Sequence, residues 1–263
     1  MYEFEFTRPA SVAEAVAALN AEEAQALGGG QTLIPTLKQR LAMPTTLVSL
    51  SGVAEMQGIG LQDDGQLVIG GATTHAEVAS GAVGTYPALA ALAGQIGDPA
   101  VRNRGTLGGS LANNDPAACY PAAALGSGAT IVTNTREIPA DEYFQGMFTT
   151  ALEEGEIVVS VKFPVPEAAN YQKFVQPASR FAMVGVFAAR FADGVRVAVT
   201  GASEEGVFRW TDAEAALASS FTPDAISALS VDPDGMIGDI HGTKAYRAHL
   251  VNVMTRRAVA AAV

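Results

Sequence analysis

Two glycine-rich segments interrupt the chain, and they limit what the backbone around them can form. The first, Gly28-Gly29-Gly30, follows the apolar run 24–27, and the second lies within Val101–Ser110. The second segment is predicted to be too rich in glycine to continue a helix. Glycine adopts positive φ and brings the backbone close to a ligand, so that successive amides converge on an anion. Two such loops, about 75 residues apart, could hold one extended dinucleotide between two lobes.

Each glycine segment also has a plainer interpretation as a tight structural turn. Neither has the G-x-x-x-x-G-K-[ST] spacing of a P-loop or the G-x-G-x-x-G spacing of a Rossmann site. The hydroxyl of Thr32 and the positive end of the helix expected after it would add donors to the first loop. The pair of loops therefore favours a nucleotide site, with structural turns left open.

The hydrophobic pattern predicts a mixed α and β chain with a boundary at Pro164-Val165-Pro166-Glu167. Ser11 can cap the first helix, with Glu14 three residues on. Expected strands are 2–6, 24–27, 46–50, 66–70, 129–133, 157–163, 171–175, 182–191 and 195–200. Expected helices are 11–19, 36–41, 87–96, 211–219 and 243–262, with a short one opening at 72–75. The expected domains are 1–165, with lobes of about 1–55 and 56–165, and 168–263.

Charge and cysteine content exclude several functions. The net charge is −11, from 27 acids and 16 bases, and no cluster of Lys and Arg suits nucleic acid or an anionic membrane. Cys119 is the single cysteine, so the chain can form neither an internal disulfide nor a Cys-ligated iron–sulfur cluster or zinc site. The three histidines are too scattered for a metal set. No signal peptide or membrane span is expected, which makes the cytoplasm the expected location.

The residues around the glycine segments resemble the FAD-binding medium subunit of the xanthine dehydrogenase and aerobic CO dehydrogenase family of molybdenum hydroxylases. The resemblance spans essentially the whole chain. It rests on Gly28–Pro35, Val101–Ser110, Asn114–Ala118, Tyr171–Phe174, Phe181–Val186, Ala245–Leu250 and Arg256-Arg257. It implies an α+β fold: a two-lobed PCMH-type FAD-binding domain, followed by a small α+β C-terminal domain of the CO dehydrogenase flavoprotein type.

The resemblance also implies cofactor contacts and no catalytic or metal-binding residue in this chain. The two glycine loops would surround the diphosphate and sugars, Ile96 and Val158 would cover the flavin ring, and Lys173 would lie near the flavin. The implied contacts are Leu27, Gly28, Gly29, Gly30, Gln31, Thr32, Leu33, Ile34, Ile96, Thr106, Leu107, Gly108, Gly109, Ser110, Asp115, Val158 and Lys173.

Some of these positions depart from the family pattern or have a second interpretation. Gln31-Thr32 replaces a common His-Ser pair, and Cys119 stands where many members have an Asp that contacts the cofactor. Pro177 and Arg180 replace a frequent Arg and Asp.

Other residues keep two interpretations. Lys173 could instead be a solvated lysine, and Asp115 could cap a turn rather than bind a sugar. Arg102 and Arg104 could hold a cofactor phosphate or a partner's carboxylate, with a surface role equally open. Arg247, Arg256 and Arg257 are expected on a helix exterior. Cys119 is expected to be a packed thiol without a basic neighbour.

The resemblance also implies which subunit carries each redox centre. FAD is expected here, bound noncovalently, and it would receive electrons from two [2Fe-2S] clusters on a small subunit. A molybdenum-molybdopterin centre on a large subunit would oxidise the substrate, and a dimer of heterotrimers is expected. Two alternatives stay open. One is a self-contained PCMH-type flavin reductase or oxidase, such as an enolpyruvyl-UDP-sugar reductase, and the other is a non-catalytic nucleotide-binding or assembly module.

Overall fold

The first strands of the chain form a parallel sheet, which is the core of the N-terminal lobe. The computed structural model describes residues 1–263 and orders these strands β1-β3-β2. The elements of this lobe are β1 (Glu5–Thr7), α1 (Val12–Leu19), β2 (Ala24–Leu27), α2 (Leu33–Lys38), β3 (Thr46–Ser49) and the 3-10 helix η1 (Ala54–Met56). The predicted cap is present, because the Ser11 hydroxyl accepts from the Glu14 amide at 3.2 Å. Helix α2 begins three residues before its predicted start and tolerates Pro35 in its first turn, where an amide lacks a helical partner anyway.

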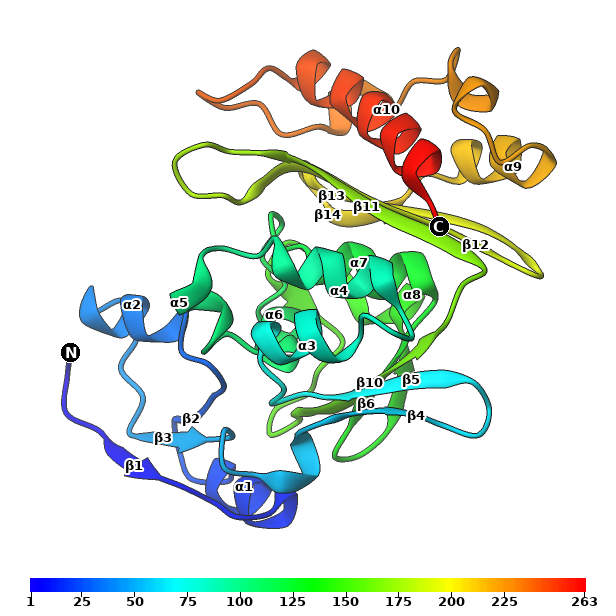
Figure 1. Ribbon diagram of the computed structural model, residues 1–263. Coiled ribbons are helices and arrows are strands. Elements are labelled where there is room, and N and C mark those ends of the chain that lie inside the picture. The colour runs from blue at the N-terminus through cyan, green and yellow to red at the C-terminus, as the bar shows by residue number, and fades with distance from the viewer.

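The second lobe has an antiparallel sheet covered by helices. Its strands run in the order β4-β5-β10-β6-β7, and Figure 1 shows the helices α3 to α8 stacked between this sheet and the C-terminal unit. The strands of this sheet are β4 (Ile59–Leu61), β5 (Gln66–Gly70), β6 (Thr130–Thr133), β7 (Glu137–Pro139) and β10 (Val158–Pro164). A separate two-stranded sheet is formed by β8 (Phe144–Gly146) and β9 (Thr149–Thr150). The helices are α3 (His75–Gly81), α4 (Pro87–Gly94), α5 (Pro99–Arg102), α6 (Leu107–Asn113), α7 (Tyr120–Ser127) and α8 (Ala140–Tyr143).

The second glycine segment contains helical turns where the sequence predicted none. Helix α6 begins inside it, and Thr106 caps this helix by accepting from the Gly109 amide at 3.2 Å. Gly108 lies against the backbone of Gly71, where an added Cβ would approach the Gly71 carbonyl oxygen to 2.8 Å. The prediction was wrong because it considered the low helix propensity of glycine alone. Close packing of two backbones requires glycine here and outweighs that propensity.

The C-terminal unit is an antiparallel sheet with helices on one face. Its elements are β11 (Ala168–Val175), β12 (Ala182–Phe191), β13 (Gly194–Ser203), β14 (Gly206–Arg209), α9 (Thr211–Ser219), α10 (Lys244–Ala261) and the 3-10 helices η2 (Pro223–Ile226) and η3 (Pro233–Gly235). The other face packs on α4 and α7 of the second lobe, so the sheet is covered on both sides (Figure 1). This double burial explains why β12 is apolar almost throughout.

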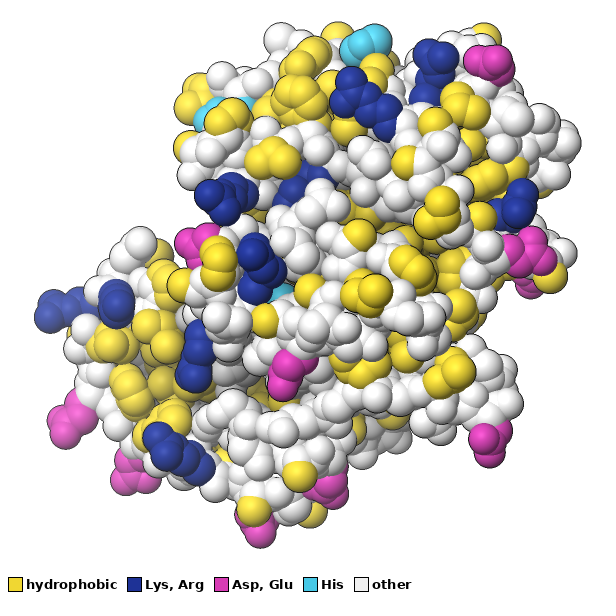
Figure 2. Space-filling view, in the orientation of Figure 1, with side chains coloured by type: hydrophobic (Ala, Val, Ile, Leu, Met, Phe, Trp, Pro, Cys, Tyr) yellow, Lys and Arg dark blue, Asp and Glu magenta, His cyan; other side chains and the backbone are white.

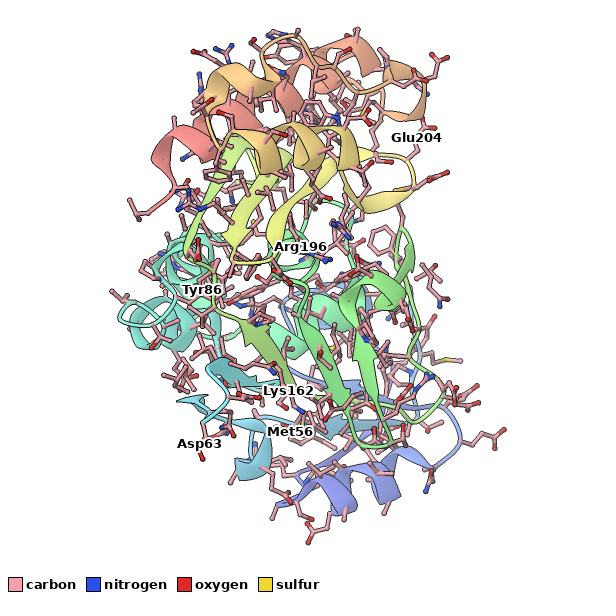
Figure 3. All side chains as sticks on the ribbon, turned by 90° about the vertical axis from the view of Figure 1, so that its right-hand side faces the viewer. Met56, Asp63, Tyr86, Lys162, Arg196 and Glu204 are labelled. Atoms are coloured by element: carbon pink, nitrogen blue, oxygen red, sulfur yellow. The ribbon has the colours of Figure 1, made fainter.

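Polar contacts join the C-terminal unit to the second lobe at the edge of this apolar layer. Arg196, which Figure 3 labels between the two units, donates to the Leu125 carbonyl at 3.0 Å and pairs with Asp141 at 2.6 Å. Inside the layer, a Cβ added to Gly126 would lie 3.0 Å from Phe187. The two units are therefore in close contact, and the sheet is held at one position on the helices.

One arginine expected on the surface is buried. Arg247 has an exposed fraction of 4% and pairs with Asp239 at 2.6 Å. It also donates to the carbonyl oxygens of Met183 and Gly201, at 2.7 and 2.9 Å. The expectation was wrong for Arg247 because the start of α10 lies on the strands, and the guanidinium satisfies carbonyls there. Arg256 and Arg257 are exposed, as expected.

Candidate functional site

A pocket of about 360 Å³ lies where the three parallel strands of the N-terminal lobe end. Ligands of parallel sheets characteristically bind outside the carboxyl ends of the strands. Here the end of β1, the turn after β2 and the end of β3 meet a loop of the second lobe. We name this the carboxyl-edge pocket. Its lining residues are Phe6, Arg8, Leu27, Gly28, Gly29, Gly30, Ile34, Ser49, Ser51, Gly52 and Arg104.

The backbone of the first glycine loop presents free donors at this pocket. No amide from Gly28 to Thr32 donates a hydrogen bond within the chain. Gly30 has a φ of +72°, in the left-handed region that favours glycine and turns successive amides in one direction. A row of unbonded amides in a concave turn fits the oxygens of a phosphate or diphosphate.

The two glycine segments touch each other. A Cβ added to Gly29 would lie 1.8 Å from the Arg104 carbonyl oxygen and 2.6 Å from the Gly105 Cα. A Cβ added to Gly28 would lie 2.9 Å from the Thr106 hydroxyl. The expectation that two lobes bring these loops together therefore agrees with the geometry. The absence of side chains at Gly28 and Gly29 is what lets the lobes approach.

Not every residue of the second loop is open to a ligand. Leu107 is fully buried in the core, and its amide donates to the Thr73 carbonyl at 3.1 Å. Gly108 donates to the Gly71 carbonyl at 2.8 Å. Gly109 is exposed and Ser110 half-buried. The first two thus support the loop from within, and the open positions are Gly109 and Ser110.

A second group of predicted contacts surrounds Lys173 on β11. The Lys173 ammonium donates to the carbonyl oxygens of Gln95 and Arg180 at 2.8 and 3.0 Å and lies 3.6 Å from the Cys119 thiol. We call these four residues the lysine cluster. A freely solvated lysine would not have two carbonyl partners from separate loops. Cys119 is packed, as expected, but the expectation that it has no basic neighbour was wrong, because Lys173 is distant in sequence and close in space.

A buried tyrosine and a sharply turned loop lie next to the lysine cluster. Tyr171 is nearly fully buried. Burial raises the pKa of its phenol well above the ordinary value, and Cys119 contributes to the same shift. Arg180 has a φ of +63°, so the loop after β11 turns back sharply and brings its carbonyl to Lys173.

The remaining predicted contacts lie at different depths. Ile96 is half-buried next to Gln95, and its carbonyl accepts from Arg102 at 3.0 Å. Val158 is packed in the core of the second lobe. The Asp115 carboxylate accepts from the Ala117 amide at 2.8 Å, which is the turn-capping arrangement that was left open.

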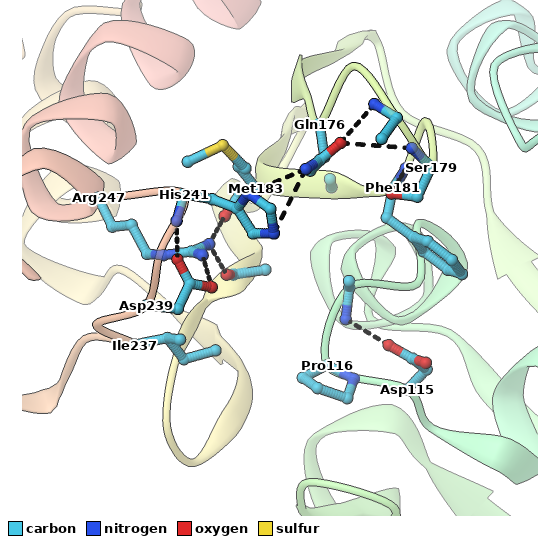
Figure 4. Close-up of a pocket in the computed structure, with 14 residues that line it drawn as sticks. Asp115, Pro116, Gln176, Ser179, Phe181, Met183, Ile237, Asp239, His241 and Arg247 are labelled. Carbon is cyan, nitrogen blue, oxygen red and sulfur yellow. Dashed lines mark hydrogen bonds and ion pairs between the residues drawn. The ribbon is translucent and has the colours of Figure 1, made fainter. Parts of the chain in front are cut away.

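A larger cavity, of about 420 Å³, lies between the second lobe and the C-terminal unit (Figure 4). Asp115 is the one predicted contact that lines it. On the opposite wall, the polar side chains pair with one another. Arg247 forms an ion pair with Asp239, and Gln176 contacts His241 at 3.0 Å. Its size therefore does not make it a better anion site than the carboxyl-edge pocket.

The sequence expectations missed Phe6, Arg8, Ser49 and Ser51, which line the carboxyl-edge pocket. Each lies within two residues of the end of a predicted strand, so a signal was present. Using it required knowing that these three strands are parallel and adjacent, which no local pattern contains.

A buried histidine behind the second loop predicts a pH-dependent stability. Burial, with a smaller contribution from Arg102, lowers the pKa of His75 to about 4 from 6.5. Between these values the unfolded chain binds more protons, so stability is lost as the pH falls. From pH 7 to pH 5 we expect a loss of about 2 kcal/mol from this group. Denaturant unfolding at both pH values measures it.

The control for this prediction is His75→Gln, which cannot titrate in that range. Its stability should change less between pH 7 and pH 5 than that of the wild-type chain. Equal pH dependence in both proteins would remove His75 as the cause.

None of the helices combines the length and apolar character that a membrane crossing needs. No three or more His, Cys, Asp and Glu side chains gather where they could hold a metal ion. The polar groups at the carboxyl-edge pocket are backbone amides, serine hydroxyls and arginine guanidiniums.

Comparisons with known proteins place this geometry in a family. Residues 2–166 match the family described as FAD binding domain in molybdopterin dehydrogenase. The chain is 34% identical to the nicotine 6-hydroxylase medium subunit of Paenarthrobacter nicotinovorans, covering 97% of this chain and 95% of that one. It is 31% identical to the carbon monoxide dehydrogenase medium chain of Hydrogenophaga pseudoflava, covering 98% and 96%.

A solved structure agrees over the same length. The structure of carbon monoxide dehydrogenase from Hydrogenophaga pseudoflava that lacks the Mo-pyranopterin moiety superposes with a TM-score of 0.87, at 32% identity over 99% of this chain and 97% of that chain. The similarity confirms the predicted α+β fold of PCMH type. The chain therefore belongs to the family of FAD-binding domains of molybdopterin dehydrogenases and is an oxidoreductase component.

Proposed function

We propose that this chain is the FAD-binding electron-transfer subunit of a heteromeric molybdenum hydroxylase. The observation that carries the proposal is the row of unbonded amides from Gly28 to Thr32 at the carboxyl-edge pocket. Such a row suits a diphosphate. The family match supports FAD as the ligand that carries this diphosphate. When bound, FAD supplies the redox chemistry, and the protein binds and tunes it.

We assign the two ends of the cofactor to two places in the structure. The glycine turn, with Gly109 and Ser110 beside it, would hold the diphosphate and sugars. Ile96, Val158 and the lysine cluster would surround the flavin ring. Lys173 is fixed by two carbonyls, so its positive charge would favour electron uptake by a ring placed there. All seventeen contacts expected from the sequence stay proposed, with Leu107, Gly108 and Val158 acting from the core.

The domain roles follow the same division. We propose residues 1–165 as the FAD-binding domain, in agreement with the family match over 2–166. Residues 168–263 form the smaller α+β domain, whose β11 contributes Lys173 to the flavin end. The C-terminal unit is thus part of the cofactor site and not an independent appendage.

We further propose that electrons enter from outside the chain. One cysteine cannot ligate an iron–sulfur cluster, so two [2Fe-2S] clusters are assigned to a small partner subunit and a molybdenum-molybdopterin centre to a large one. The medium chains and medium subunit among the relatives support such an assembly, and we expect a dimer of heterotrimers. An external acceptor would receive the electrons.

The first test concerns how the cofactor is held. Because amides, hydroxyls and guanidiniums line the carboxyl-edge pocket and the one cysteine, Cys119, is buried, we expect FAD to be bound noncovalently. Acid precipitation of the purified yellow protein should release the flavin into the supernatant, where chromatography should identify it as FAD. Flavin that stays in the pellet would contradict noncovalent binding, and a protein without flavin that also fails to take up added FAD would contradict the proposed function.

A further inference from the structure

The carboxyl-edge pocket has a charge opposite to that of the whole protein. The chain carries a net charge of −11, with 27 acids among 263 residues. The eleven residues that line the pocket include two arginines, Arg8 and Arg104, and no acid. The larger cavity, in contrast, contains Asp115 and Asp239 beside Arg247. A local excess of positive charge in an acidic protein indicates selection for an anion.

Neither arginine of the pocket forms an ion pair or donates a hydrogen bond to another group of the chain. Half of the sixteen lysines and arginines form ion pairs, but Arg8 and Arg104 do not. Neither guanidinium donates a hydrogen bond within the chain; Arg8 only lies over the ring of Phe6 at 5.2 Å. Arg102, which could also have held a phosphate, donates to the carbonyls of Ile96 and Gly97. The structure therefore separates two arginines that sequence alone left equivalent.

The two arginines reach the pocket from different lobes. Arg8 follows β1, and Arg104 supplies the carbonyl that packs on Gly29. The glycine turn with its unbonded amides lines the same pocket. Figure 2 shows Lys and Arg side chains recurring along the left of this face, from the N-terminal lobe upward. A doubly charged group held by the turn would therefore share its pocket with two forked cations.

We propose that Arg8 and Arg104 bind the diphosphate of the dinucleotide, and that this pair makes the chain select FAD over flavins that lack a diphosphate. The inference rests on the proposed function and adds two residues to its site. Arginine presents planar, forked donors that match phosphate oxygens and stay charged at any physiological pH. The pair also offsets the repulsion between a diphosphate and an acidic protein.

The experiment compares ligands that share parts of FAD. The full-length chain is freed of flavin and titrated with FAD, riboflavin and ADP, for the wild type, Arg8→Gln, Arg104→Gln and the double variant. Each single change should weaken FAD and ADP by about 10-fold and the double change by about 100-fold, as expected for lost charge-assisted bonds. Riboflavin affinity should change by less than about 3-fold. Higher salt should weaken FAD binding more in the wild type than in the double variant.

Arg257→Gln is the matched control, because Arg257 is exposed on α10, forms no ion pair and lies outside the pocket. It should bind all three ligands like the wild type. Wild-type FAD and ADP affinity in the double variant would overturn the inference and leave FAD binding intact. An equal loss of riboflavin and FAD would also overturn it, because the arginines would then act on the fold. If the wild-type chain binds ADP but not FAD, the proposed function is overturned and the phosphate site is retained. If it binds neither ligand, the proposed function and the inference are both overturned.

Discussion

A Gly29→Ala chain is expected to lose FAD affinity by about 100-fold or more, which corresponds to about 3 kcal/mol. The added methyl group would lie 1.8 Å from the Arg104 carbonyl oxygen, a distance that no side-chain adjustment can relieve. The loops of the two lobes would have to separate, and the amides from Gly28 to Thr32 would no longer face the same ligand. Flavin content after purification and titration of the flavin-free chain with FAD measure the loss.

Gly60→Ala is the control for this prediction. A Cβ added to Gly60 meets nothing within 4 Å, and this strand position is distant from the glycine turn. It should keep its flavin and its folding stability within about 1 kcal/mol of the wild type. The thermal unfolding of Gly29→Ala should show a folded protein weakened by about 1–3 kcal/mol, the usual cost of overpacking. Wild-type FAD affinity in Gly29→Ala would exclude the contact between the two glycine loops from the cofactor site.

The purified chain, saturated with FAD, is expected to oxidise no substrate when it is alone. Its flavin would receive electrons only from a partner's iron–sulfur centre docked near the ring. Electron transfer requires close approach, so the interface should be specific and bury on the order of 1,000 Å² or more. Candidate N-heterocycles, aldehydes and CO would be assayed with an artificial acceptor, first with the isolated chain and then with the products of its genomic neighbours. Turnover should appear only in the assembled complex.

Two further measurements decide what a negative or positive result means. Chemical reduction of the isolated chain should bleach the flavin, which shows that the cofactor is competent. The active complex should contain molybdenum and iron in addition to FAD. Substrate oxidation by the isolated chain would favour a self-contained flavoenzyme instead. A flavin-free chain that assembles with the same partners would favour a nucleotide-binding or assembly module.

The two glycine segments show how far local sequence predicts this site. Glycine triplets after a strand indicate a turn that can cradle an anion, and that expectation agrees with the free amides at Gly28–Thr32. The second segment was expected to be non-helical, yet α6 begins within it. Gly108 is required there by the backbone of Gly71, about 40 residues away in sequence. Helix propensity is a local quantity, whereas close backbone packing depends on a distant element.

Contacts between distant residues account for the other differences. Lys173 and Cys119 are 54 residues apart in sequence, and they meet at 3.6 Å because the C-terminal sheet packs on α4 and on α7, whose N-cap is Cys119. Arg247 was expected on the exterior of its helix. Its burial depends on the carbonyls of Met183 and Gly201, which a different part of the chain supplies.

By itself, the sequence determined the α+β class, the glycine turn, most strands and helices, and the family, because these follow from periodicity, capping and motif spacing within short windows. The tertiary structure decided which residues share the proposed cofactor site. It brought the ends of three parallel strands to one pocket, placed Arg104 there while Arg102 was satisfied elsewhere, and brought Lys173 to Cys119. The physical reason is that strand order and lobe packing arise from burial summed over the whole chain, and no short window of residues contains that sum.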